Sequence, residues 1–495
     1  MTAALAAPGA SGAPSWWAWA LRGLGTGRMD PVAYDTAWLA RVRTAGGDLA
    51  FPGCWDWLGE HQHPDGSWGA AAPWGADRAA ATAAALVALA EAARDGLRPV
   101  SPSVIALGRR ALESHLADLA AGGPPGGGAT LTVGLEFCLP ALLEEARALG
   151  LAVPAAPEAL VRRGRAKLAR LPAEWRQHPP PSLCHSLEGW AGGQVPAGLL
   201  DESGSCANSP SATAYHQMRR PHRAALRYLR GACRGGGAVD VRPFEVFETA
   251  WVLDFLALAG ADLRAPAFGA HADLLQAAMR PDGTAGISAH GIEPDADDTA
   301  LALVALARAG RPAAAEALRG FERDAGFACF PFERDPSVSA NVHVAYAALR
   351  VPGAGRASVL AKVLSFLADA RLPGGYWVDK WHLSPYYPTG RAVLALGRVA
   401  PDLVAPARLW LLESQRPDGG WGLAGSTPEE TAYAVFGLAA PAAPHPAEAL
   451  ARAAAYLRGA PAGPALWIGK GLYHPRLVTE AAAAAALQVA RRWAR

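Results

Sequence analysis

The sequence predicts an all-α protein, and three observations support that prediction. Ala-rich and Leu-rich segments with helical periodicity recur along the 495 residues, whereas sustained two-residue alternation of Val, Ile and Thr is hard to find. Residues 79–93, AAATAAALVALAEAA, form one such segment. Clusters of Gly and Pro separate the expected helices near 121–129, 176–182 and 234–237, and the last cluster marks an expected domain boundary.

Composition narrows the class of protein. The chain is long enough for two or more domains, and its net charge of +2, from 46 basic and 44 acidic residues, gives no general reason to expect nucleic acid or an anionic membrane as a partner. The apolar stretches are mostly Ala with charged flanks, unlike membrane spans, and the N-terminal segment lacks the basic start of an export signal. We expect a cytoplasmic protein, with contact at a membrane surface left open.

The cysteines support the same compartment. They are scattered, without the spacing of a zinc site or of a compact disulfide framework, which suits a reducing environment. The six positions are Cys54, Cys138, Cys184, Cys206, Cys233 and Cys329.

A Pro-Asp-Gly turn repeats along the chain, and each copy is followed by an acidic residue at the start of an Ala-rich helix. In such turns a Trp ring can pack against a neighbouring helix while the polar side chains hold backbone groups, so each copy alone is a packing device. The acid follows the proline at the same distance in the first and third copies and at a longer distance in the second. The copies are HPDGSWG (63–69) with Asp77, RPDGTAG (280–286) with Asp298, and RPDGGWG (416–422) with Glu430.

The second copy carries more negative charge than the start of a helix needs. Asp295, Asp297 and Asp298 lie within four positions at the start of the apolar segment 293–310. One or two acids there are favoured by the positive end of the helix macrodipole, and the repeat makes Asp298 the counterpart of the acids in the other copies. Asp295 and Asp297 are the surplus, which calls for a chemical explanation.

Together with the D-x-D-D pattern, these turns resemble terpene cyclases that begin their reaction by protonation, specifically class II diterpene cyclases of the copalyl diphosphate synthase type. The resemblance runs nearly end to end, and the His and Tyr pair of residues 379–392 are typical of the bacterial branch. The segments that carry it are AYDTAWLARV (33–42), WLGEHQHPDGSWG (57–69), VGLEFCLPALLEEAR (133–147), KLARLP (167–172), HSLEGWAGG (185–193), SPSATAYH (209–216), FEVFETAW (244–251), DADDTALA (295–302), SANVHV (339–344), DKWHLSPYYPTGRA (379–392) and LWIGKGLYHP (466–475).

The resemblance implies a fold of two α-helical barrels, one of β type and one of γ type, with the active site between them. Residues 31–235 would form the γ domain, inserted after the first helix of the β domain, which comprises residues 1–30 and 236–495 and carries D-x-D-D. The sequence contains no DDxxD metal motif, so the resemblance implies that the product keeps its diphosphate.

The chemistry of such an enzyme explains the surplus carboxylates. Protonating an isolated alkene requires a strong acid in a dry pocket, and burial with a neighbouring carboxylate keeps one proton bound. The helix N-terminus has the opposite effect because it favours the anion. In the family the middle Asp is the acid, here Asp297, with Asp295 and Asp298 beside it, and Asn341 of SANVHV matches the Asn that orients that acid. A capping or turn role for Asn341 is the alternative.

The resemblance also indicates residues for the substrate. Lys470 is the expected contact of the diphosphate, with Lys380, Lys167 and Arg170 as further candidates, although a solvated surface role fits any one of them equally well. Aromatic faces can stabilise a carbocation, although each ring alone is more often part of a core. The expected aromatic residues are Trp251, Tyr376, Trp377, Trp381, Tyr386 and Tyr387.

Magnesium is the cofactor expected from the family. Plant relatives carry an acidic run just before the GLEF-type segment, whereas this chain has AAGGPPGGGATLTV there. Only Glu136 lies close by, so it is the metal-ligand candidate.

A further expectation concerns the base that ends the reaction. In plant cyclases of the ent-copalyl type, a His and an Asn hold the water that takes the final proton. His185 matches that histidine, and Asp240 falls where the Asn is expected. An Asp can accept a hydrogen bond from water or from His185, and its charge would strengthen the pair as a base. The alternative is a core histidine and a loop acid.

The preferred function is the cyclisation of geranylgeranyl diphosphate to a bicyclic, copalyl-like diphosphate, with farnesyl diphosphate giving a drimane-type product as the alternative. Two other classes stay open. A squalene-hopene type cyclase shares D-x-D-D but is usually longer, and the DKWH and WIGK segments argue against it. A non-catalytic barrel protein would not need an acid.

Overall fold

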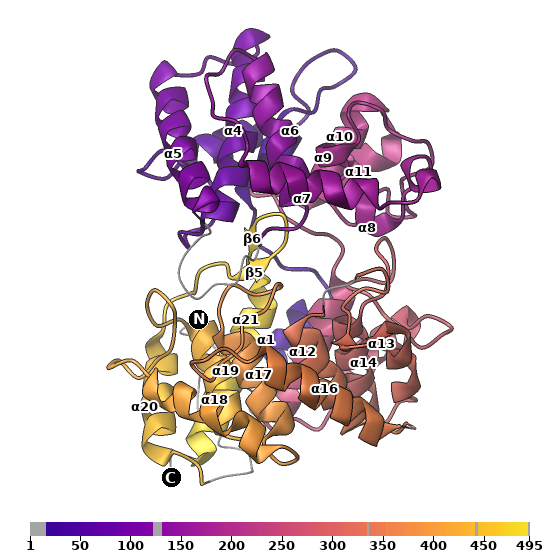
Figure 1. The fold of residues 1–495 in the computed structure, drawn as a ribbon, viewed down its shortest axis with the longest axis vertical. Coiled ribbons are helices and arrows are strands. Elements are labelled where there is room, and N and C mark those ends of the chain that lie inside the picture. Colours follow the sequence, from indigo (N-terminus) through magenta and orange to yellow (C-terminus); the bar gives the residue numbers. More distant parts are fainter. Residues whose placement is uncertain (1–15, 122–130, 334–335, 354, 441–443, 494–495) are drawn as a thin grey trace.

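The structure, a computed structural model, describes residues 16–121, 131–333, 336–353, 355–440 and 444–493. The N-terminal residues 1–15 and nearly all of the Gly- and Pro-rich run at 121–129 lie outside these described residues. Within them the chain is helical apart from three short hairpins, and Figure 1 shows two helical lobes, so the predicted all-α fold of two barrels is confirmed.

The lobe drawn in the upper half of Figure 1 contains a ring of five helices, α2, α4, α6, α9 and α10. Each helix contacts the next in that order, and α10 contacts α2, which closes the ring. Its hairpin pairs Cys233 with Ala238. The elements of this lobe are α2 (Ala33–Ala40), α3 (Gly53–Glu60), α4 (Gly75–Arg94), α5 (Pro102–Ala120), α6 (Leu135–Ala148), α7 (Glu158–Ala169), η1 (Ala173–Arg176), α8 (Pro181–Cys184), α9 (Leu187–Trp190), α10 (Pro210–Arg219), α11 (Arg223–Ala232), β1 (Cys233–Arg234) and β2 (Gly237–Ala238).

The lower lobe has an inner ring of six helices, α12, α14, α15, α17, α19 and α21, which also closes on itself because α21 contacts α12. The elements of this lobe are α1 (Ala18–Gly23), α12 (Glu245–Leu258), η2 (Pro266–Phe268), α13 (Gly269–Ala278), α14 (Ala296–Arg308), η3 (Ala315–Phe321), β3 (Glu322–Arg323), β4 (Gly326–Phe327), α15 (Val338–Ala348), α16 (Arg356–Ala370), α17 (Tyr386–Leu396), α18 (Pro401–Glu413), α19 (Pro428–Leu438), α20 (Ala447–Gly459), β5 (Trp467–Ile468), β6 (Leu472–Tyr473) and α21 (Arg476–Trp493).

Inner helices of both rings are buried on nearly every side. In α4 the predicted Ala-rich segment 79–93 is almost wholly buried, which is the expected place for a helix that is apolar all round. Ala side chains let neighbouring helices approach closely. The ends of the inner helices are therefore closely packed, and the acids at the start of α14 are buried.

Two hydrophobic cores divide the chain. One draws on residues 20–32 and on residues from 232 to 490, and the other on residues 33–238 together with Ile468 and Leu472 of the β5–β6 hairpin. The two segments in which the chain passes between the lobes lie side by side, because Val32 N donates to Ala238 O at 2.7 Å. The β5–β6 hairpin reaches up between the lobes (Figure 1). The expected limits of the inserted domain, residues 31 and 235, stay a prediction.

The repeated turns are packing devices. The indole N–H groups of Trp68 and Trp421 donate to the carbonyl ten residues earlier, at 2.8 and 2.6 Å. Trp377 makes the same bond at 2.8 Å, so residues 372–377 are a further copy that the sequence analysis did not recognise. Its indole is fully buried in that turn, which explains why Trp377 is not available to a substrate.

The spacing of the copies differs from the expected one. In each of the three predicted copies, a threonine of the following helix accepts a hydrogen bond from a backbone N–H of the turn, 14 residues earlier in the first two copies and 10 in the third. The second copy therefore carries no extra residues, and the third is the short one. Asp298 and Glu430 directly precede this threonine, whereas Asp77 lies five residues before it, so the equivalence of Asp298 with Asp77 is wrong.

Candidate active site

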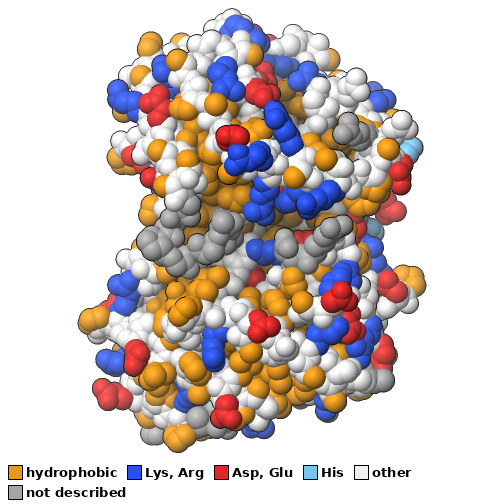
Figure 2. All heavy atoms as spheres, viewed as in Figure 1, with side chains coloured by type: hydrophobic (Ala, Val, Ile, Leu, Met, Phe, Trp, Pro, Cys, Tyr) orange, Lys and Arg blue, Asp and Glu red, His pale blue; other side chains and the backbone are white. Residues whose placement is uncertain are grey.

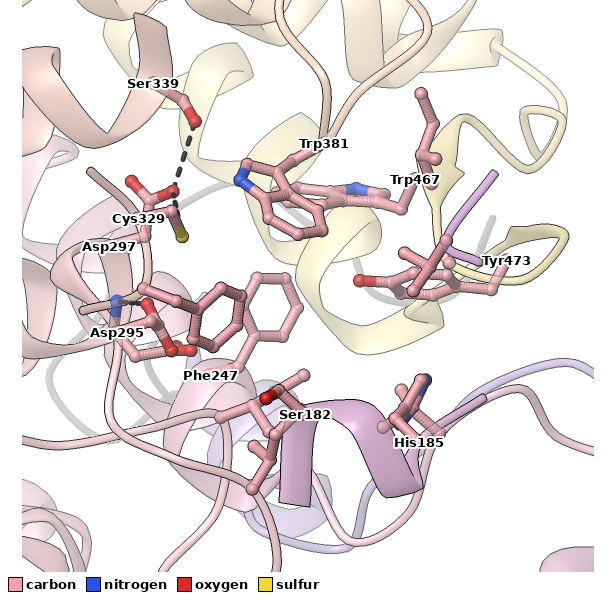
Figure 3. Close-up of a pocket in the computed structure, with 18 of the residues that line it drawn as sticks. Ser182, His185, Phe247, Asp295, Asp297, Cys329, Ser339, Trp381, Trp467 and Tyr473 are labelled. Atoms are coloured by element: carbon pink, nitrogen blue, oxygen red, sulfur yellow. Dashed lines mark hydrogen bonds between the residues drawn. The ribbon is translucent and has the colours of Figure 1, made fainter. Parts of the chain in front are cut away.

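A cavity of about 1050 Å³, counting the space at its open mouth, lies where the two lobes meet. The wall takes Val133, Ser182 and His185 from the upper lobe and the rest from the lower lobe, including the D-x-D-D acids and a set of aromatic rings (Figure 3). The cavity is mainly apolar, with three of its carboxylates together at the start of α14 and Asp240 and Glu333 elsewhere on the wall.

Asp297 is held at this wall by both carboxylate oxygens. A hydrogen bond of 2.6 Å joins Oδ1 to Nδ1 of His343, and Ser339 Oγ lies 3.2 Å from Oδ2. The Cys329 thiol approaches Oδ2 at 4.0 Å, and Figure 3 shows Ser339 and Cys329 next to Asp297. Asp297 is thus a buried carboxyl group that lines the cavity and has a fixed orientation.

The other two acids surround the start of α14. Asp295 is the N-cap, and its Oδ1 accepts from Asp298 N at 2.8 Å. Burial raises the pKa of Asp295 to about 7. Burial, followed by the charge of Asp295, raises the pKa of Asp298 well above its ordinary value, and Asp298 Oδ1 has no hydrogen-bond partner. The desolvation predicted from the sequence therefore outweighs the stabilisation of the anion by the helix N-terminus.

His343, and not Asn341, contacts the acid. Asn341 Oδ1 accepts from Phe327 N at 2.9 Å, and its Nδ2 donates to the carbonyls of Phe327 and Ser337, both at 2.8 Å. The predicted hydrogen bond from Asn341 to Asp297 is therefore wrong. Ser339 and His343 are four residues apart on α15 and share a face, whereas the intervening Asn341 points elsewhere. That i, i+4 spacing is the signal that the sequence analysis missed.

Three of the expected aromatic residues, Trp251, Trp381 and Tyr387, line the cavity. Trp377 does not, because it is fully buried in its turn, and Tyr376 and Tyr386 do not, because each stacks on Trp410 with ring centroids 4.7 Å apart, outside the wall. The prediction for these three is wrong. The wall also contains rings that the sequence analysis did not name, namely Phe247, Phe330, Phe332, Trp467 and Tyr473.

Lys470 is sealed inside the protein. Its Nζ donates to Glu188 Oε1 at 2.6 Å and to the hydroxyls of Ser209 and Ser211 at 2.6 and 2.7 Å, and the residue is 1% exposed. An ammonium group has three protons, so all of its donors are used. The predicted contact between Lys470 and a diphosphate is therefore wrong, and this lysine ties the β5–β6 loop to the upper lobe.

The other predicted cations lie outside the cavity wall. Lys380 forms an ion pair of 2.7 Å with Glu333, which does line the cavity. Lys167 pairs with Glu136, three residues beyond the lining residue Val133, and Arg170 is exposed at the end of α7. The two lysines thus lie near the cavity, each facing an acid.

Glu136 is the acid that the sequence offered to magnesium. It is buried, and its ion pair with Lys167 already compensates its charge. Across the described ranges, no group of three or more His, Cys, Asp and Glu side chains is placed to hold a metal ion. The described residues therefore do not form a preassembled magnesium site around Glu136.

His185 and Asp240 both line the cavity. His185 Nδ1 lies 2.8 Å from the Ala207 carbonyl, so Nδ1 carries the proton and Nε2 keeps a free lone pair. Burial, followed by the charge of Lys470, lowers the pKa of His185 to about 3. Burial raises the pKa of Asp240 to about 6, and Asp240 Oδ1 accepts from Gly471 N at 3.3 Å. No direct hydrogen bond is recorded between the two side chains in the described structure.

The position of Asp240 depends on a glycine in the β5–β6 loop. A Cβ on Gly469 would lie 1.8 Å from Asp240 Oδ2, so a larger residue there would displace the carboxylate. The glycine that the sequence shows in WIGKG thus has a physical role, because it lets this backbone approach the acid closely.

Comparisons with known proteins agree with this fold. Residues 335–470 match the squalene-hopene cyclase C-terminal domain. The chain is 32% identical to the type B diterpene cyclase of Mycobacterium tuberculosis over 94% of this chain and 96% of the relative, and 33% identical to an ent-copalyl diphosphate synthase of a Streptomyces species over 86% of each. It therefore belongs to the class II terpene cyclases and is an enzyme of that class. A solved ent-copalyl diphosphate synthase from Streptomyces platensis matches with a TM-score of 0.76 and 32% identity, covering 96% of this chain and 98% of that one.

The structure adds one negative finding. Among the described helices, none is long and apolar enough to cross a bilayer.

Proposed function

We propose that the protein cyclises geranylgeranyl diphosphate, by protonation, to a bicyclic labdane-type, copalyl-like diphosphate that retains the diphosphate. The observation that carries this proposal is Asp297, a buried carboxyl group that lines an aromatic cavity and is held in one orientation by His343 and Ser339. Relatives named as copalyl diphosphate synthases support the substrate, as does an Arabidopsis relative, 25% identical with a TM-score of 0.69, that was solved with an aza-geranylgeranyl thiolodiphosphate.

Asp297 is the proposed general acid. The proton moves from Oδ2 to the less substituted CH carbon of the distal alkene, and the tertiary carbocation forms at the dimethyl-substituted carbon next to it. Oδ1 keeps its hydrogen bond to His343 throughout, so the carboxylate left behind stays oriented. Apolar walls exclude water, which keeps the acid strong and the cation unquenched.

The aromatic wall has the next role. As ring closure moves positive charge along the chain, the faces of Trp251, Trp467 and Tyr387 lie at the cavity surface to stabilise it. These rings are packed against one another, with centroids 6.3 Å apart for Trp251 and Trp467 and 5.0 Å apart for Tyr387 and Trp467. A packed wall of this kind holds one folded conformation of the substrate.

The reaction ends with loss of a proton. We assign this step to His185 and Asp240, which lie on the cavity wall and come from the upper lobe and the connection below it. Nε2 of His185 has a free lone pair, and Asp240 is a carboxylate above its pKa of about 6. A water held between them, hydrogen-bonded to Nε2 of His185, would pass the proton to Asp240, which is the stronger base because the pKa of His185 is only about 3.

The diphosphate takes no part in bond breaking and needs only to be held. Lys380 and Lys167, whose acidic partners lie at or near the cavity wall, are the proposed contacts, and both can exchange a glutamate for a phosphate. Magnesium is proposed to arrive with the diphosphate, because the described acids do not preassemble a site.

The test is to incubate the purified protein with geranylgeranyl diphosphate and, separately, with farnesyl diphosphate, each with and without magnesium chloride. Products are dephosphorylated and identified by mass spectrometry and NMR. A bicyclic C20 alcohol supports the proposal, and a drimane-type C15 product as the only one overturns the substrate while keeping the chemistry. Unconverted substrates in both arms would overturn the proposed function.

A further inference from the structure

A buried charged network lies behind the acid, away from the cavity. Arg391 Nε lies 3.1 Å from His343 Nε2, and Arg391 Nη1 lies 2.7 Å from Asp254 Oδ2. All three residues are at most 1% exposed. They come from α17, α15 and α12, so side chains from two adjacent helices of the inner ring and from a third, non-adjacent helix meet at this point.

The contacts of this network fix the protons on His343. A guanidinium only donates hydrogen bonds, so His343 Nε2 must accept the bond from Arg391 and carries no proton. The proton of the neutral ring is then on Nδ1, from which it is donated to Asp297 Oδ1. Because Oδ1 accepts, the acidic proton of Asp297 is on Oδ2, the oxygen next to Ser339 and Cys329.

We propose that Arg391 is a positioning residue for the acid, which holds His343 as the neutral Nδ1–H tautomer and thereby keeps the reactive proton on Asp297. The proposal rests on the proposed function, in which Asp297 is the general acid. It goes further, because it assigns the state of the acid to an arginine that does not touch the cavity.

The competing state explains why an arginine is needed. One proton shared by Asp297 and His343 can lie on the carboxyl group, or it can lie on the ring to give a carboxylate and an imidazolium. Only the first arrangement can protonate an alkene. An imidazolium would have to give up its bond from Arg391 and face that positive charge in a dry interior, where the repulsion is weakly screened. Burial, followed by the charge of Arg391, lowers the pKa of His343.

Arg391 itself stays charged. Asp254 compensates it, and Asp254 also accepts from Arg308 Nη1 at 2.8 Å and from Tyr346 OH at 2.9 Å. These contacts hold the pKa of Asp254 down at about 2, despite its burial. A carboxylate that does not titrate near neutral pH keeps the guanidinium in place.

The titratable and charged groups around His343 come from α14, α17 and α12 and from α15 itself. They are Asp297 and Arg308 from α14, Arg391 and Tyr387 from α17, Asp254 from α12, and Tyr346 from α15 itself. Helix α16 also packs on α15, but its charged residues Arg356, Lys362 and Asp369 are at exposed or half-buried positions.

The first test reads the tautomer directly. Histidine side chains are labelled with ¹⁵N, and long-range ¹H–¹⁵N correlation spectra are recorded between pH 6 and 8, with the His343 signal assigned by its loss in His343→Gln. We expect a neutral ring protonated at Nδ1 throughout this range. An imidazolium, or a ring protonated at Nε2, would overturn the proposal whether or not the enzyme is active.

The second test is kinetic. Arg391→Gln should lower kcat at neutral pH roughly tenfold or more, within the range expected when a general acid is impaired, with little change in KM. In this variant the proton shared by Asp297 and His343 should move to His343. Asp297 would then need a second proton before it can act as the acid, so the pH optimum of kcat should shift to lower pH. Arg391→Lys keeps the charge and should restore part of kcat.

The matched control is Arg356→Gln, the same change at an exposed site on α16, outside the charged network of His343, Arg391 and Asp254. It should leave the tautomer and the pH profile as in the wild type. An Arg391→Gln enzyme with an unchanged pH profile would contradict the proposal, and if that variant does not fold, the wild-type NMR spectrum decides alone. An active Asp297→Asn enzyme would instead overturn the proposed function.

Discussion

His343 Nδ1 lies 2.6 Å from Asp297 Oδ1, and this contact joins the start of α14 to the middle of α15, two adjacent helices of the inner ring. It places an imidazole directly against the middle carboxyl group of D-x-D-D. The acid therefore has a partner that supports its oxygen without filling the cavity. The chemistry of the site depends on which of the two groups holds the proton.

Asp297→Asn should abolish cyclisation, with kcat lower by about 10²-fold or more, because the proton donor is lost while the shape of the side chain is kept. The fold should survive, since Asp295 still caps α14. Product formation and thermal unfolding measure the two effects. Asp369→Asn, the same change at an exposed site on α16, should be silent in both. Turnover near the wild-type rate would remove Asp297 from its role.

Lys470→Met should destabilise the protein by about 3–5 kcal/mol, because breaking a buried ion pair leaves Glu188 uncompensated. KM should change little, since Lys470 does not line the cavity. Urea unfolding and steady-state kinetics give the two readings. The double variant Lys470→Met with Glu188→Gln should regain part of the stability. A raised KM at unchanged stability would mean that Lys470 does reach the diphosphate.

Lys380→Met and Lys167→Met should each raise KM, roughly tenfold if one charge-assisted bond to phosphate is lost, with kcat largely kept. The diphosphate is unreacted, so its contacts are equal in the ground and transition states. Arg162→Met is the matched control, because Arg162 lies on α7 with Lys167 but pairs with Glu158 in solvent. Equal KM values for Lys167→Met and the control would exclude Lys167.

His185→Ala and Asp240→Asn should leave alkene protonation intact and divert the product toward a hydroxylated or rearranged diphosphate. The base form of Asp240 is lost as the pH falls through about 6, so the wild type should show the same diversion below that pH. Product spectra from pH 5 to 8, compared with His185→Ala and Asp240→Asn at pH 8, measure this. A product spectrum unchanged from the wild type in both variants would place the base elsewhere in the cavity.

Asp295→Asn should stabilise the protein at pH 8 but not at pH 4. Burial raises the pKa of Asp295 in the folded state to about 7 from 3.8. The contribution of Asp295 to the free energy of unfolding is therefore fully present below pH 4 and is lost as the pH rises through 7. Asn also caps a helix and carries no charge. The rise in Tm should be a few degrees at most, since one kcal/mol corresponds to about 2 °C or less in a chain of this size.

A variant with the opposite sign serves as the control for Asp295→Asn. Hydrogen bonds from Thr284 lower the pKa of Asp282, so its contribution is present above pH 4 and is lost as the pH falls. Asp282→Asn should therefore lower Tm at pH 8. If Asp295→Asn changed Tm equally at pH 4 and pH 8, the charge of Asp295 would have no part in the change in stability.

By itself, the sequence determined the helical class, the turns and the acidic cluster, because these depend on short-range rules. Ala and Leu periodicity predicts α14, and three carboxylates within four positions stand out in any apolar helix. The motifs that resemble class II cyclases also identified Asp297, and His185 and Asp240 do share the cavity wall with it.

Only the tertiary structure decided which side chains meet. Asn341 and His343 are two residues apart, but a helix turns them to different neighbours, so one binds the β4 backbone and the other the acid. Nothing in the sequence shows that Lys470 has an acidic partner, but Glu188, 282 residues away, accepts a hydrogen bond from its ammonium group and compensates its charge. The physical reason is that packing brings together residues from distant helices, and burial forces each charge to find a partner there.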